Sequence, residues 1–133
     1  MTRPRTLAEV ARRRNAGADF SFLLREFLDE FYSALRSTLA GEGIVEEPIA
    51  VADPQEHAMF GAVAEHLARR WNLAIPPWTE SPSRFLHRPY FTTSIEGLKA
   101  LLLAESPIAF RRRLIFTEAE PLRRARMPIS APL

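Results

Sequence analysis

Prolines interrupt the middle of this 133-residue chain and limit most strongly what it can fold into. Four of them lie between residues 72 and 92, at positions 76, 77, 82 and 89. Proline lacks a backbone N–H and disfavours helical geometry in the residue before it, so no continuous helix can cross this segment. We therefore expect an extended, proline- and aromatic-rich connector between an N-terminal helical part and a C-terminal one.

Helix-start signals precede the connector and place two helices near the N-terminus. Thr6, with Glu9 three residues later, predicts a capped helix that ends near residues 15–17. Asp19 then predicts the start of a longer helix that reaches about Leu39, because apolar residues recur at helical spacing along one face of this stretch. We expect the glycines that follow to stop this helix.

A third helix is predicted after residues 40–53, a stretch without helical period that we expect to form a loop. Asp53 supplies a capping carboxylate, Pro54 occupies the first helical position and Glu56 lies in the first turn. Together they make a strong helix start. Apolar residues at helical spacing continue from there to about Trp71, where we expect this helix to end.

Two shorter helices are predicted after the connector. Thr93, with Glu96 three residues later, predicts a helix over residues 94–104. Leucines surround the axis of this helix, and a helix that is apolar all round is typical of a buried central element. Ser106 and Pro107 predict the start of a second short helix, which leads into three consecutive arginines.

These patterns predict an all-α fold, a compact bundle of about five helices that includes the proline- and aromatic-rich connector. Alternation typical of strands never extends beyond a few residues. A chain of 133 residues with 47% hydrophobic composition fits one globular domain. We expect a single helical domain over residues 1–126 and a flexible C-terminal tail over residues 127–133.

The composition argues against several classes of protein. The chain has no cysteine, which removes disulfides, thiolate catalysis and cysteine-ligated zinc and suits a reducing cytoplasm. Its longest apolar run, residues 100–104, is far below the ~20 residues that a membrane-spanning helix needs. The arginines near the N-terminus are not followed by the apolar core of a signal peptide. We expect a soluble cytoplasmic protein without membrane contact.

Side chains able to carry catalysis are not arranged for it. His57 and His66 lie nine residues apart on one predicted helix, whereas a helical metal-binding pair needs the spacing of H-E-x-x-H. Glu26, Asp29 and Glu30 form a run on the polar face of the long helix, where carboxylates are normally solvated. The sequence predicts no enzyme, no cofactor and no metal site, and we expect the histidines at the surface or at helix ends.

Candidate binding residues gather between residues 78 and 113, where stiff backbone, aromatic rings and fixed positive charge occur together. The predicted partner-binding residues are Trp78, Arg88, Tyr90, Phe91, Arg111, Arg112 and Arg113. On a short helix the three consecutive arginines fan across roughly 200 degrees, so they cannot all hold one ligand group. We expect at least one of them to pair within the chain, with an acidic residue of the long helix or with a helix C-terminal carbonyl.

Several interpretations of these arginines stay open at this point. The sequence pI is about 9.7, and further arginine clusters at residues 12–14 and 123–126 could extend the same patch towards nucleic acid. The residue pattern favours a structural role for these arginines first, a protein partner second and nucleic acid third, and a homo-oligomer stays open as well.

Several blocks of the chain resemble a family of small bacterial proteins. They are residues 24–31, 64–70, 76–78, 88–91 and 98–116, the last including Glu105-Ser106-Pro107 and the triple arginine. Members of this family are abundant in actinobacteria and are often encoded beside nucleotidyltransferase-type toxins of the abortive-infection class. The resemblance covers about residues 6–126, and its motifs carry no known chemistry. Relatives often have a polar residue after the triple arginine, where this chain has Leu114.

The resemblance implies an antitoxin-like or accessory subunit that binds a neighbouring toxin. Aromatic residues would then be buried against the nucleotidyltransferase-type toxin, and arginines would meet its acidic residues or its nucleotide-phosphate pocket. The alternative is a small arginine-rich regulator that binds nucleic acid.

Overall fold

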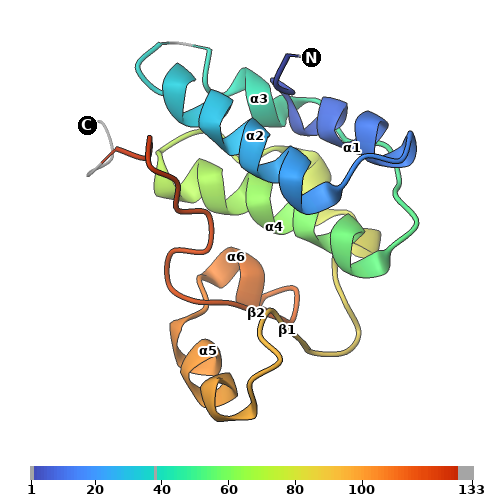
Figure 1. Ribbon diagram of the computed structural model, residues 1–133, viewed down its shortest axis with the longest axis vertical. Helices are drawn as coiled ribbons and strands as arrows, with labels where there is room; N and C mark the ends of the chain where they lie inside the picture. Colours follow the sequence, from blue (N-terminus) through green and yellow to red (C-terminus); the bar gives the residue numbers. More distant parts are fainter. Residues whose placement is uncertain (1, 38, 129–133) are drawn as a thin grey trace.

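The computed structural model describes residues 2–37 and 39–128 and is mostly helical (Figure 1). The α-helices of this part are α1 (Leu7–Asn15), α2 (Phe20–Ala34), α3 (Glu42–Val45), α4 (Pro54–Arg70), α5 (Lys99–Glu105) and α6 (Ile108–Arg111). The other regular elements are 3-10 turns at Pro77–Glu80, Pro82–Arg84 and Glu96–Leu98 and the strands β1 (Tyr90–Phe91) and β2 (Ile115–Phe116). The mainly helical character is confirmed, whereas the two short strands are not among the predicted elements.

The predicted starts of α1 and α4 are confirmed by their caps. The Thr6 hydroxyl accepts a hydrogen bond from the Glu9 amide at 3.0 Å. The Asp53 carboxylate accepts one from the Gln55 amide at 2.8 Å. Each cap satisfies a backbone donor that has no partner inside its own helix, which is why these starts are visible in the sequence. α4 ends at Arg70, next to its predicted end.

The segment after α2 differs from the prediction. α2 ends at Ala34, more than a turn before its predicted end, and residues 42–45 form α3 inside the predicted loop. The early end lets the chain turn back, so that Ile44 of α3 is fully buried in the core. Gly43 permits this approach, because a Cβ there would lie 3.3 Å from the Arg5 carbonyl oxygen. A glycine that was expected to stop a helix therefore lies inside one.

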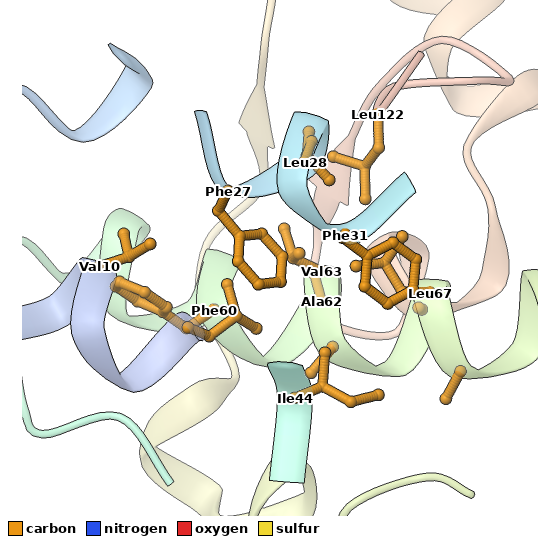
Figure 2. Close-up of a cluster of buried hydrophobic side chains, with 14 of the residues drawn as sticks. Val10, Phe27, Leu28, Phe31, Ile44, Phe60, Ala62, Val63, Leu67 and Leu122 are labelled. Carbon is orange, nitrogen blue, oxygen red and sulfur yellow. The ribbon is translucent and has the colours of Figure 1, made fainter. Parts of the chain in front are cut away.

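The hydrophobic core lies between α1, α2, α3 and α4 (Figure 2). Figure 2 shows Phe27 and Phe31 of α2 in one cluster with Phe60 of α4 and Ile44 of α3. Every residue of α4 from position 60 to position 68 is buried. The central element of the fold is therefore α4, and not the leucine-rich helix after the connector.

The two strands pair in parallel, with Tyr90 opposite Ile115 and Phe91 opposite Phe116. Parallel strands require a crossover connection, and here residues 92–114 form it and contain both α5 and α6. We refer to residues 95–108 of this crossover as the arm. Figure 1 shows α5 at the end of the molecule away from α1, α2 and α3.

The C-terminal segment runs back to the helical layer. The Tyr32 hydroxyl donates to the Leu122 carbonyl oxygen at 2.7 Å, and Arg124 pairs with Asp29 at 2.9 Å. Met127 packs against the core. Residues 129–133, which make up the rest of the predicted tail, lie outside the described residues.

Candidate functional site

The triple arginine was the strongest binding signal in the sequence, and the structure places it in internal contacts. Arg113 is fully buried and donates to the Glu65 carboxylate at 2.6 Å. Its guanidinium also donates to the carbonyl oxygens of Ala109 and Thr79, each at 2.7 Å. Glu65 lies on α4 and is itself fully buried, so this ion pair joins the central helix to the segment that directly follows α6, away from solvent.

Glu65 is shared with two further arginines. Arg112 donates to Glu65 at 2.9 Å and to Glu80 at 2.8 Å, and Arg69 donates to Glu65 at 2.7 Å. Burial alone would raise the pKa of Glu65, but hydrogen bonds from the three arginines outweigh burial and hold that pKa below its ordinary value. Glu65 is therefore an ionised anchor, and not a carboxyl group able to donate a proton near neutral pH.

Arg111 caps the neighbouring helix. Its guanidinium donates to the carbonyl oxygens of Ala104 and Ser106, both at 3.1 Å, at the C-terminal end of α5. A cation at this end is favoured by the helix dipole. Internal pairing of the triple arginine is therefore confirmed, although its acidic partners are Glu65 of α4 and Glu80, and not residues of the long N-terminal helix.

The other predicted partner-binding residues lie around the same contacts. The half-buried Trp78 indole donates to a backbone carbonyl of α3 at 3.0 Å. Tyr90 packs against the core, and Phe91 stacks on Phe116 with ring centroids 5.1 Å apart. Arg88 is exposed. The structure therefore brings most of the predicted residues into internal contacts, and does not unite them as one exposed surface.

A serine–histidine contact on α4 has the wrong polarity for nucleophilic catalysis. His57 Nε2 lies 3.0 Å from Ser83 Oγ, and His57 Nδ1 lies 3.3 Å from Nη1 of Arg84. A guanidinium can only donate, so Nδ1 accepts and the neutral ring carries its proton on Nε2. Nε2 then donates to the serine and has no lone pair with which to deprotonate it. Burial, reinforced by Arg84, lowers the pKa of His57 and keeps the ring neutral.

His66 is buried, so its predicted position at the surface or a helix end is wrong. Its ring packs edge-on against Phe110 with centroids 5.6 Å apart, and burial lowers its pKa. Across residues 2–37 and 39–128, no three histidine, cysteine or acidic side chains are grouped so as to hold a metal ion. The helices of the same residues include none with the length and apolar character of a membrane span.

The leucines after the connector lie at the surface, so their predicted burial in a central element is wrong. The helix α5 has seven residues, and only one side of so short a helix can face the body. Leu102 occupies that side and is buried. Five other aliphatic residues of this segment are between 41 and 59% exposed, namely Ile95, Leu98, Leu101, Leu103 and Ile108.

The base of the arm is fixed to the sheet. The buried Ser106 hydroxyl accepts from the Thr117 amide at 2.8 Å and donates to the Leu102 carbonyl oxygen at 2.6 Å. The Lys99 ammonium lies 5.2 Å from the centre of the Phe91 ring, a favourable cation–π distance. Together with the Arg111 cap, these contacts hold α5 in one position relative to β1 and β2.

The arginine clusters are largely neutralised within the chain. Six of the nine arginines at residues 12–14, 111–113 and 123–126 form ion pairs with acidic side chains. The pairs are Arg12–Glu46, Arg13–Glu9, Arg14–Glu56, Arg112–Glu80, Arg113–Glu65 and Arg124–Asp29. Two thirds of the arginines in these clusters therefore already face an acidic side chain of the same chain.

Comparisons of the chain with protein-family models, curated proteins and solved structures found no match. Three features of the site escaped prediction, namely Glu65 as an internal anchor, the burial of His66 and the exposure of the arm. A signal for the first exists, because Glu65 follows Gly61 by one helical turn. A Cβ at Gly61 would lie 3.0 Å from Nε of Arg113, so the glycine makes room for the arginine that Glu65 binds.

Proposed function

We propose that this chain is a non-catalytic protein-binding module that docks through the arm. Its partner is a nucleotidyltransferase-type toxin, towards which it acts as an antitoxin or accessory subunit. The observation that carries the docking surface is the set of exposed aliphatic side chains on a base fixed by hydrogen bonds. The choice of partner rests on the family resemblance.

Exposed apolar side chains of this kind favour association. Complete burial of an aliphatic side chain contributes about 1.5–3 kcal/mol, so covering the exposed half of each would contribute on the order of 1 kcal/mol. Monomeric proteins rarely expose apolar patches larger than a few hundred Å², and the largest apolar patch on a monomer is often functional. Because the arm is already held in position, little conformational entropy is lost when a partner covers it.

The charge arrangement supports a protein partner over nucleic acid. A surface that binds DNA or RNA needs arginines free to contact phosphates. Six arginines of the three clusters pair with acidic side chains instead, and the net charge of the chain is only +2. The arm, by contrast, offers aliphatic side chains, which carry no preference for a phosphate backbone.

Co-expression with a nucleotidyltransferase-type toxin of the abortive-infection class tests the proposal. We expect the unmodified chain to co-elute with the toxin in size-exclusion chromatography and to relieve its growth arrest. The double variant Leu101→Ser/Leu103→Ser should lose both effects. The matched control is Val45→Ser/Ile49→Ser, which replaces aliphatic residues that are 65% and 50% exposed outside the arm and should retain both.

Two results would contradict the proposal. One is the absence of a complex with the unmodified chain. The other is an arm variant that binds the toxin as well as the control variant does. Salt-sensitive binding of DNA or RNA that the arm variant retains would favour the nucleic-acid alternative.

A further inference from the structure

We infer that the partner encloses the arm in an apolar groove and contacts Leu101 and Leu103 from opposite sides, an inference that rests on the proposed function. A flat partner surface, or a second copy of this chain, would cover the arm differently. Four properties favour a groove over these alternatives, namely helix geometry, the space around α5, the charges of the arm and its surface area.

Helix geometry places the two leucines on opposite flanks. Successive residues of an α-helix are about 100 degrees apart, so Leu101 and Leu103 lie on either side of the buried Leu102. Their directions differ by about 160 degrees. Leu101 is 50% exposed and Leu103 is 46% exposed. A flat surface placed against one flank leaves the other in water, whereas a groove covers both.

Space for a surrounding partner exists on the body side of the arm as well. A groove of about 450 Å³ separates α5 from the helical layer. Leu98 and Leu102 line it from the arm, and Leu24 of α2 and Met59 of α4 line it from the body. The arm therefore projects from the body, as Figure 1 also shows, and a wall of a partner's groove can enter beside it.

The charges of the arm point to an apolar groove and not to a charged one. Lys99 is the only basic residue between positions 95 and 108, and it pairs with Glu96 at 2.7 Å. Glu105 is the one remaining charged residue of the arm. Recognition therefore depends on the shape and apolar character of the groove, as when an amphipathic helix binds in a hydrophobic cleft.

The area of the arm argues against a second copy as the occupant. Five half-exposed aliphatic residues offer roughly 300–400 Å² of apolar surface. A stable interface buries about 800 Å² on each partner. Two arms pressed together fall well short of that value, whereas a groove also buries the flanks, the alanines and the backbone of the arm.

Thiol accessibility tests this inference because the chain contains no cysteine. Single-cysteine variants Leu101→Cys and Leu103→Cys, with Val45→Cys on α3 as the control, are reacted with a maleimide alone and in complex with the toxin. The rate of addition to this chain is followed by intact mass. We expect the complex to slow labelling at positions 101 and 103 by about tenfold or more, and to leave position 45 unchanged.

Each alternative gives a different result. Protection of only one leucine position overturns the groove while leaving the proposed function intact. A complex without protection at either position shows that the toxin binds elsewhere. Protection of both positions in the isolated chain, rising with its concentration, assigns the arm to a second copy. Failure to form any complex overturns the proposed function itself, and the inference with it.

Discussion

At the scale of single residues, Glu65 and Arg113 carry opposite charges where solvent does not reach them. Removing one partner of a buried ion pair leaves the other charge uncompensated, which typically costs about 3–5 kcal/mol. We expect Glu65→Gln to lower the free energy of unfolding by about 3 kcal/mol, measured by urea denaturation.

The matched comparison is the double variant Glu65→Leu/Arg113→Met. It removes both charges together, so its loss of stability should be smaller than the sum of the two single losses. If Glu65→Gln changes stability by less than about 0.5 kcal/mol, the pair does not hold α6 on α4 as described.

Leu114 has a φ of 62°, in the left-handed region that a bulky side chain seldom adopts. Asparagine tolerates this geometry better, and a polar residue at this position also matches the pattern of the resembled family. We expect Leu114→Asn to raise the free energy of unfolding by about 0.5–1 kcal/mol in urea denaturation. Gly17→Ala is the opposite control, since a φ of 108° should make it destabilising.

The buried histidine makes stability depend on pH. Burial lowers the pKa of His66 in the folded chain, so below about pH 6.5 the unfolded chain binds more protons than the folded one. Stability from this source is present at neutral pH and is lost as the pH falls. We expect the free energy of unfolding to decrease from pH 7.5 to pH 5.5, and His66→Gln to reduce that slope. An unchanged slope in His66→Gln would exclude this residue as the cause.

At the scale of elements, Ser106 links α5 to β2 through its hydroxyl. Ser106→Ala leaves the buried Thr117 amide without that acceptor, which costs about 1–3 kcal/mol. We expect faster hydrogen exchange at Thr117 and in α5, with the central part of α4 unchanged. Ser33→Ala, which removes a hydroxyl at an exposed position of α2, should alter neither region. Equal exchange in both variants would show that Ser106 does not fix the arm.

The starts of α1, α2 and α4 were predictable from sequence because their caps are local, whereas α5 begins at Lys99 and not at the predicted residue 94. Thr6 and Asp53 each contact a backbone amide within three residues. The end of α2 was not predictable in the same way, because it depends on Ile44 reaching a core built from residues far away in the chain. Two strands of two residues each are too short to leave a periodic signal.

The sequence pattern predicted exposed arginines and buried leucines in the candidate site, whereas Arg113 is buried and most leucines of α5 are exposed. Composition makes leucines core residues and arginines surface residues, and both expectations are reasonable on average. Arg113 is buried because Glu65, 48 positions earlier, supplies its counter-charge. The leucines of α5 are exposed because the short crossover helix lies at the end of the molecule. Neither cause is visible without the tertiary contacts.

At the scale of the whole molecule, the acidic face of α2 binds segments near both termini. Arg3 pairs with Glu26 and Arg124 pairs with Asp29, so the N-terminal and C-terminal segments both contact α2. The triple arginine similarly fastens the base of the arm to α4. The hydrophobic core and these ion pairs therefore hold the body of the molecule together, and the arm is left as its apolar projection.

The most direct test of this division is to measure stability and toxin affinity in the same arm variant. For Leu101→Ser/Leu103→Ser we expect the free energy of unfolding to fall by no more than about 2 kcal/mol, because only about half of each residue is buried in the folded chain. We expect its dissociation constant for the proposed toxin partner to rise by about tenfold or more, since covering the exposed half of each leucine contributes on the order of 1 kcal/mol. A large loss of stability with unchanged affinity would contradict the account.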